Sequence, residues 1–242
     1  MIDHFEILVL LARPAAGKSE VIHYLKSLPA KERLEKFHIG DLLELDDFPM
    51  LWTWFEEDDL LERMGHPRLH TSIDGYFIAP YLWNLLIERI GLDYHKKLRD
   101  QPNLHQRYTL LVEFSRGKEH GGYAEAFKHI PADMAARMSI LFLQVSWEES
   151  HRKNRKRFNP DKPDSILEHG LSDDKMVRLY KENDWEELTA GSPETINIQC
   201  YRVPYVTMPN EDDVTTAGGE TLGKRLKDSL DQLWHIACKV NR

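Results

Sequence analysis

Five short apolar runs, spread along the whole chain, constrain the fold more than any other feature of the sequence. Each run is rich in Val, Ile, Leu or aromatic residues, and the runs cover residues 5–12, 36–40, 108–114, 139–145 and 201–208. Runs of five to eight such residues are typical of strands buried on both faces of a parallel sheet. Amphipathic helical patterns lie between them. This alternation predicts a doubly wound α/β fold, in which a five-stranded parallel sheet lies between two layers of helices.

The uneven spacing of these runs predicts two insertions within a single domain that spans residues 1–242. Residues 41–107 separate the second run from the third, and 146–200 separate the fourth from the fifth, whereas a simple crossover needs about a dozen residues. We therefore expect a helical insertion over 41–107 and a charged insertion over 147–190. The 41% apolar and 30% charged content is ordinary for a globular domain.

Three simple features limit the environment and the partners that we expect for the chain: its charge, its cysteine content and its first residues. A formal charge of −8 opposes binding to nucleic acid. Two cysteines provide neither a disulfide framework nor a metal-binding spacing. The opening sequence "MIDHFEILVLLARP" has no basic leader, and no apolar run approaches the roughly 18 residues of a membrane span. We expect a cytoplasmic protein with no membrane contact, and the sequence sets no oligomeric state.

The segment after the first apolar run matches most of a phosphate-binding loop. Gly17-Lys18-Ser19 completes the pattern G-x-x-x-x-G-K-[ST], although Ala12 stands at the first glycine of the pattern and suits it only if φ is negative there. In such loops the lysine contacts the β/γ-phosphates, the hydroxyl suits Mg²⁺, and the following helix directs its N-terminal amides at the anion. We therefore expect ATP to contact a continuous stretch made of Arg13, Pro14, Ala15, Ala16, Gly17, Lys18, Ser19 and Glu20.

Taken in order along the chain, these motifs resemble the P-loop nucleoside and nucleotide kinases of the adenylate-kinase-like group. The resemblance rests on "ARPAAGKS" after the first run, "FHIGDLLEL" at the second, and a basic helix after the fourth. It implies a P-loop NTPase fold that uses ATP and Mg²⁺, in which 41–107 binds the phosphoryl acceptor and 147–190 is a mobile lid. The chain departs from this family at Ala12 and in lacking an Asp-Gly pair after the third strand.

The stretch "LLVEFSRG" stands where that pair would be. Glu113 emerges at the carboxyl end of a buried strand, which is where ligands bind in open α/β sheets. Its carboxylate could join Ser19 in holding Mg²⁺, or could accept a proton from an attacking hydroxyl. The stretch also looks like a shifted E-R-S motif of deoxynucleoside kinases, which implies that Arg116 binds phosphate on the substrate. The alternative is a strand-end carboxylate paired with a surface lysine.

A second cluster, "SWEESHRKNRKRF" at 146–158, begins with a helix-capping box. Arg152 and Arg155 follow at helical spacing, and guanidinium groups can stabilise the charge of a phosphoryl group in transfer. We therefore assign both arginines as catalytic candidates. One alternative is a solvent-exposed helix stabilised by i,i+4 ion pairs. Another is a nucleic-acid-binding patch, which the net charge opposes.

The acceptor site is the least readable part of the sequence. Asp41 comes at the end of the second run and is the strongest candidate, while Arg68 and Asp74 lie farther along the same insertion. Acids can accept hydrogen bonds from sugar hydroxyls, and an arginine suits an acceptor that already carries phosphate. The aromatic residues of 52–83 could stack on a base, although such residues more often form a helical core. After the fifth run, "TMPNEDDVTT" stands where the related kinases pass the chain around the adenine base, and the resemblance implies that Asn210 touches the base of ATP. A polar turn explains this residue equally well.

Together these features predict an ATP- and Mg²⁺-dependent kinase that acts on a small-molecule acceptor, a nucleoside or a nucleotide. One alternative is a P-loop nucleotide-binding regulatory protein without efficient phosphotransfer, which Ala12 and the missing Asp-Gly pair favour. A weaker alternative is a nucleic-acid-associated ATPase that uses the basic run 151–157. The sequence sets neither the identity of the acceptor nor the base preference.

Overall fold

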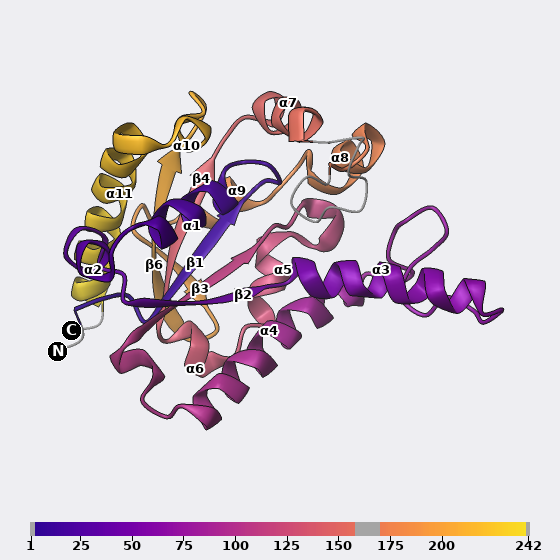
Figure 1. Ribbon diagram of the computed structural model, residues 1–242, viewed down its shortest axis with the longest axis horizontal. Helices are drawn as coiled ribbons and strands as arrows, with labels where there is room; N and C mark the ends of the chain where they lie inside the picture. The colour runs from indigo at the N-terminus through magenta and orange to yellow at the C-terminus, as the bar shows by residue number, and fades with distance from the viewer. Residues whose placement is uncertain (1–2, 158–169, 241–242) are drawn as a thin grey trace.

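The computed structural model of the chain describes residues 3–157 and 170–240, and shows a largely parallel sheet between two layers of helices (Figure 1). The strands are β1 (Ile7–Ala12), β2 (Asp41–Asp46), β3 (Tyr108–Phe114), β4 (Met138–Gln144), β5 (Thr195–Ile198) and β6 (Tyr201–Pro209). Their order in the sheet is β2-β3-β1-β4-β6-β5. Every neighbouring pair is parallel except β5–β6, which is antiparallel. The predicted α/β class is confirmed, and β5 adds an edge strand to the five that were expected.

Helices occupy most of the remaining chain. They are α1 (Lys18–Ser27), α2 (Ala30–Phe37), α3 (Phe48–Arg63), α4 (Tyr81–Asp100), α5 (Gly122–Lys128), α6 (Ala132–Ala135), α7 (Trp147–Arg157), α8 (Asp173–Tyr180), α9 (Trp185–Thr189), α10 (Val214–Ala217) and α11 (Gly219–Val240), with short 3₁₀ turns η1 (Leu104–Gln106) and η2 (Lys118–His120). Within the described part of the chain, no helix combines the length and the apolar character needed to cross a membrane.

The central strand β1 explains the three layers. All six of its residues are buried, and their alternation sends successive side chains to opposite faces of the sheet. Ile7, Val9 and Leu11 join a core formed with α4, α5 and α6. Leu8 and Leu10 join a second core formed with α1, α2 and α11. A strand this apolar needs a helical layer on each face, as the sequence predicted.

The second strand lies later in the sequence than predicted. The run 36–40 forms the end of α2 and a turn at His38, whose φ of 56° is left-handed, and β2 begins at Asp41. Its position could not be predicted because β2 is an edge strand with three acids among its six residues, so it lacks the continuous apolar character of a central strand. As a result Asp41 lies at the amino end of β2, and Asp46 lies at its carboxyl end beside Glu113 of β3.

The insertion predicted over 41–107 contains β2 and two long helices. Helices α3 and α4 pack through a small apolar cluster built on Trp54, Leu82, Trp83 and Leu86. In Figure 1, α3 extends away from the body of the sheet, and the segment that joins it to α4 turns back along it. The second predicted insertion, 147–190, contains α7, α8 and α9, while its central part, 158–169, lies outside the described residues.

Candidate functional site

The predicted phosphate-binding loop joins β1 to α1. Strand β1 ends at Ala12, which pairs in register with Leu143 of β4 and has no left-handed backbone. The left-handed positions of the loop are Ala15 (φ 56°) and Gly17 (φ 105°). The condition that Ala12 avoids positive φ is therefore met, and this loop needs its glycine at position 17 rather than at 12.

Side chains from the body of the fold hold two carbonyl groups at the start of this loop. The buried Tyr123 hydroxyl of α5 donates to the Ala12 carbonyl (3.1 Å). The Ser150 hydroxyl of α7 donates to the Pro14 carbonyl (2.8 Å). The N-cap residue of α1 is Gly17, which has no side chain to cap the helix, and the first amides of any α-helix have no intrahelical partner. These amides and the positive end of the helix dipole suit an anion.

Asn210 is a buried residue that supports the phosphate-binding loop through hydrogen bonds. It is fully buried, and its amide donates to the Ala16 carbonyl (2.9 Å) and to the Thr215 hydroxyl (2.7 Å). The Thr215 side chain in turn lies against Gly17, where an added Cβ would come within 2.3 Å of the Thr215 hydroxyl oxygen. Sequence reasoning placed Asn210 at the base of ATP, whereas the structure places it under the phosphate loop.

Replacing Gly17 by alanine should disrupt this arrangement, since the new Cβ would collide with Thr215 and the backbone would keep its positive φ. We expect a lowered melting temperature and at least about tenfold weaker ATP binding, measured by thermal denaturation and titration calorimetry. Gly65→Ala is the matched control, because Gly65 also has positive φ (81°) but no atom lies near its added Cβ. Equal melting temperatures and ATP affinities for the two variants would contradict this assignment.

Two cavities meet at the loop. The larger, of about 1020 Å³, lies between the carboxyl ends of β2 and β3, the helices α3 and α4, and α8. The smaller, of about 740 Å³, lies between α1, α7 and the segment 213–219. The residues that line both are Ala15, Lys18, Ser19, His23 and Arg157. A ligand in either cavity therefore reaches the lysine and the serine of the loop.

The predicted nucleotide contacts divide between these cavities. Pro14 lines the larger cavity, and the smaller one is lined by Ala15, Ala16, Gly17, Lys18, Ser19 and Glu20. Arg13 lines neither cavity, because its guanidinium turns into the protein and donates to the Lys181 carbonyl (3.0 Å) and the Val145 carbonyl (3.5 Å). Arg13 therefore ties the loop to the segment after α8.

A pair of carboxylates lies at the end of the larger cavity that is nearest to the loop. Asp46 and Glu113 end adjacent strands, are partners in the β2–β3 register, and both line the cavity. Burial raises the pKa of Asp46 from 3.8 to about 7, and the neighbouring Glu113 adds to the rise. Burial also raises the pKa of Glu113, which Lys18 opposes. Lys18 itself donates to the Ser115 hydroxyl (2.8 Å) just beyond β3.

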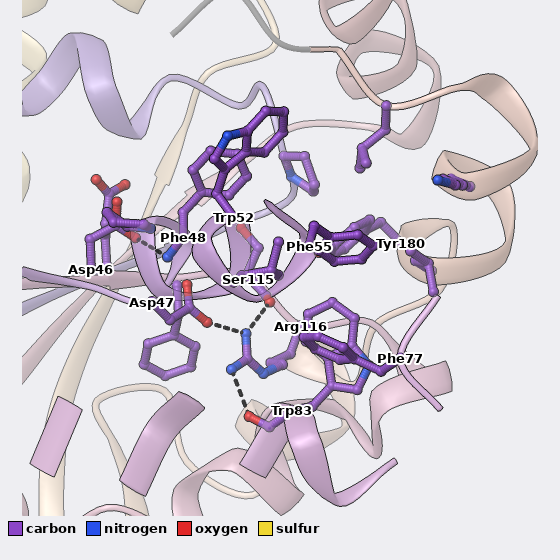
Figure 2. A pocket seen from close by; sticks show the side chains of 18 of the residues that line it. Asp46, Asp47, Phe48, Trp52, Phe55, Phe77, Trp83, Ser115, Arg116 and Tyr180 are labelled. Atoms are coloured by element: carbon purple, nitrogen blue, oxygen red, sulfur yellow. Dashed lines mark hydrogen bonds and ion pairs between the residues drawn. The ribbon is translucent and has the colours of Figure 1, made fainter. Parts of the chain in front are cut away.

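Arg116 lines the same cavity but is already engaged. Its guanidinium is buried and donates to the Asp47 carboxylate (2.6 Å), the Ser115 carbonyl (2.7 Å) and the Trp83 carbonyl (3.1 Å), as Figure 2 shows. It also lies 5.3 Å from the centre of the Trp83 ring, within the range of a cation–π contact. Breaking a buried pair of this kind leaves an uncompensated charge, so Arg116 first of all fixes Asp47 and the wall of the cavity.

Aromatic rings line one part of the larger cavity. The rings that line it and are labelled in Figure 2 are Phe48, Trp52, Phe55, Phe77, Trp83 and Tyr180. They come from α3, from the segment before α4, from α4 itself and from α8. Trp54 belongs instead to the core between α3 and α4, so only part of the aromatic stretch of the sequence serves as a helical core. Trp83 belongs to that core as well and also lines the cavity.

Three residues predicted for the acceptor site do not reach the cavity. Asp41 lies at the far end of β2 and binds Arg107 (2.6 Å), as the shift of that strand requires. Arg68 donates to Asp59 (2.7 Å) and to Glu62 (2.9 Å), and so fastens the loop that follows α3 to that helix. Asp74 is exposed on the same loop, outside the residues that line the cavity.

The predicted catalytic arginines lie on the outer face of α7. Arg152 is exposed and donates twice to Glu149 (both 2.7 Å), and Arg155 is exposed and forms a two-pronged pair with Asp173. Neither lines the larger or the smaller cavity. The side chains of α7 that do line one are Lys153, Asn154, Lys156 and Arg157. Sequence spacing identified the basic helix but not the face that it turns to the site.

No family model matches the chain, and no curated protein matches it. Among solved structures, TT1252 from Thermus thermophilus is similar at 12% identity over 98% of each chain, with a TM-score of 0.44. An unliganded sugar kinase from Janibacter sp. HTCC2649 is 11% identical over 98% of this chain and 99% of its own (TM-score 0.40). Chaetomium thermophilum Kti12 in complex with ADP-AlF3 is 12% identical over 95% and 98% (TM-score 0.45). At these levels the likenesses identify neither a family nor an activity for the chain.

Proposed function

We propose that the chain is an ATP- and Mg²⁺-dependent phosphotransferase that moves the γ-phosphoryl group of ATP to a small acceptor, a nucleoside or a nucleotide. The observation that carries the proposal is the meeting of the two cavities at Lys18 and Ser19. A transferase must hold a donor and an acceptor at once, with the reacting atoms about 3 Å apart. One loop that opens to two cavities provides that arrangement.

The smaller cavity suits the donor. Its wall combines the loop, the start of α1 and the exposed cations Lys156 and Arg157, which favour a polyphosphate. Lys153 lies in the same wall and pairs with Asp213. In the described ranges no group of three or more His, Cys, Asp or Glu side chains could hold a metal ion. Mg²⁺ in a kinase needs only one or two protein ligands, because phosphate and water oxygens complete its coordination shell. The Ser19 hydroxyl and the Glu113 carboxylate fit this ion, which would offset charge on the phosphates.

The larger cavity suits the acceptor, and its carboxylate pair supplies the base. An acceptor hydroxyl near Asp46 and Glu113 would attack the γ-phosphorus and form a new O–P bond. The bond from that phosphorus to the β,γ-bridging oxygen breaks, and ADP leaves with the electron pair. The hydroxyl proton passes to the carboxylate pair, whose raised affinity for a proton suits that role. Lys18 lies between this pair and the donor cavity and would stabilise charge on the transferred group.

The rate should follow the protonation of Asp46. Only the ionised form accepts a proton, so we expect turnover to rise about tenfold per pH unit below pH 7 and to level off above it. Between about pH 4 and 7, Asp46 is protonated in the folded state and ionised in the unfolded chain. The contribution of Asp46 to the free energy of unfolding therefore falls as the pH rises through that window. Asp46→Asn should therefore raise the melting temperature more at pH 8 than at pH 5. Turnover that stays constant from pH 5.5 to 8 would contradict the assignment.

Acceptor-dependent release of ADP tests the function. A panel of nucleosides, nucleotides and sugars is incubated with the protein, ATP and Mg²⁺, and ADP is measured against a blank without acceptor. We expect at least one acceptor to raise ADP release at least about tenfold above the blank. ATP binding without any acceptor-dependent release would instead support the alternative of a regulatory nucleotide-binding protein.

A further inference from the structure

The ammonium group of the loop lysine is held by a neutral partner. Lys18 Nζ donates to Ser115 Oγ, 2.8 Å away, and Ser115 is the first residue after β3. Ser115 is partly exposed and lines the larger cavity. A hydroxyl oxygen accepts a hydrogen bond from an ammonium group without neutralising its charge. The full charge of Lys18 therefore remains available to phosphate oxygens.

Stronger acceptors for this lysine lie in the same cavity. Asp46, Asp47 and Glu113 all line it. Burial raises the pKa of Asp46 and of Glu113, and the charge of Lys18 opposes both rises, as does Arg157 at Glu113. The lysine thus acts on both carboxylates electrostatically while its hydrogen bond goes to a hydroxyl. A direct ion pair with either carboxylate would compete with the phosphates for Lys18 and would occupy the base.

The backbone of Ser115 is fixed from the other side. Its carbonyl accepts from the buried Arg116 guanidinium (2.7 Å), which also donates to Asp47 (2.6 Å) and to the Trp83 carbonyl (3.1 Å), as Figure 2 shows. Arg116 therefore engages the third carboxylate and at the same time anchors the residue that holds Lys18. A hydroxyl carried by an anchored backbone is a fixed acceptor for the loop lysine.

We propose that Ser115 is a positioning residue that keeps Lys18 from pairing with Asp46 and Glu113, so that the ammonium stays available to ATP and the carboxylates to the acceptor. The inference rests on the proposed function and assigns a role to a side chain that the local sequence did not mark. Without the hydroxyl, Lys18 would turn to another acceptor, and Coulomb attraction favours a carboxylate.

Titration calorimetry with ATP and Mg²⁺, without acceptor, tests this role apart from turnover. Ser115→Ala should weaken ATP binding at least about fivefold, because the phosphates would have to break a new ion pair. Ser115→Thr keeps a hydroxyl and should bind ATP within about twofold of the parent. Melting temperatures confirm that the variants fold. A folded Ser115→Ala variant that binds ATP like the parent would overturn the inference.

Removal of the two carboxylates separates this role from damage to the segment. When Asp46→Asn and Glu113→Gln are both present, adding Ser115→Ala should change ATP affinity by less than about twofold, because neither competing carboxylate remains. A merely structural role for Ser115 would instead give the same loss in both backgrounds. That result would overturn the inference.

Ser150→Ala is the matched control. Its hydroxyl also holds the loop, through the Pro14 carbonyl (2.8 Å), but it does not contact Lys18. Its effect on ATP binding should be the same with and without Asp46→Asn and Glu113→Gln. If the carboxylate substitutions restored ATP binding to Ser150→Ala as fully as to Ser115→Ala, the restoration would not be specific to the lysine and the inference would fail.

The role of Ser115 and phosphotransfer can fail separately. Restored ATP binding without acceptor-dependent ADP release from the parent would leave the role of Ser115 standing and remove the phosphotransferase. Acceptor-dependent ADP release by a parent whose Ser115→Ala variant binds ATP equally well would do the reverse.

Discussion

Lys18→Ala should abolish phosphotransfer, with turnover at least about a thousandfold below the parent and weakened ATP binding. The lysine is the first residue of α1 and lines both cavities. Its removal leaves the charge that develops on the transferred group without its nearest cation. Folding should survive, because the side chain's hydrogen bond is to a partly exposed serine, Ser115. Steady-state kinetics and calorimetry measure the two effects.

Two companion variants sharpen the test of the loop lysine. Lys36→Ala changes an exposed lysine of α2 that pairs with Glu32 one turn away, outside both cavities, so it should behave like the parent. Lys18→Arg keeps the charge but not its compact shape and should recover little activity. If Lys18→Ala turned ATP over at the parental rate, the site would have to lie elsewhere in the chain.

Asp46→Asn and Glu113→Gln should each lower turnover about a hundredfold with little change in ATP affinity. The two carboxylates are register partners and share one environment, so they should act as a unit. The double variant should therefore lose far less than the product of the two single effects. The two single variants and the double variant form a double-mutant cycle with the parent. Steady-state kinetics measure their turnover, and melting temperatures confirm that they fold.

Asp41→Asn is the control on the same strand. Asp41 lies at the amino end of β2 and pairs with Arg107, away from the cavity, so turnover per folded molecule should remain within about twofold of the parent. An equal loss in Asp41→Asn and Asp46→Asn would show that the effect comes from damage to β2 rather than from the loss of a base.

The strand, loop and helix at the N-terminus could be predicted because several levels of the sequence agree there. The run before Ala12 is apolar at every position that the sheet buries, and Gly17 stands where the backbone is left-handed. The local sequence pattern and the tertiary packing therefore favour the same strand–loop–helix structure. The placement of Ser19 and Glu113 beside the larger cavity follows from the rule that parallel strands present their ligand sites at one edge.

The acceptor side could not be read as well, because its geometry depends on an edge strand. Three of the six residues of strand β2 are acids, and its start at Asp41 rather than at residue 36 moves the carboxylate that lines the cavity from Asp41 to Asp46. The signal that could have identified it is "LELD" at 43–46, whose two-residue period fits a strand. Strand β5 could not be predicted for a similar reason, because it has four residues and only two of them are aliphatic.

Helix faces and buried partners form a third class of feature that local sequence does not determine. Arg152 and Arg155 satisfy the helical spacing of a catalytic face, yet the packing of Ser150 against the loop turns them outward. Asn210 follows the expected strand, but its amide is taken up by Ala16 and Thr215. Both outcomes depend on contacts between segments far apart in the chain.

The most direct measurement follows the γ-phosphoryl group itself. ATP labelled at the γ-phosphorus is incubated with Mg²⁺, the protein and each nucleoside or nucleotide of the panel, and the products are separated by chromatography. The two-cavity site predicts label on a nucleoside or a nucleotide with the parent protein, and none with Lys18→Ala. Label found only in inorganic phosphate, or transfer that Lys18→Ala leaves intact, would contradict it.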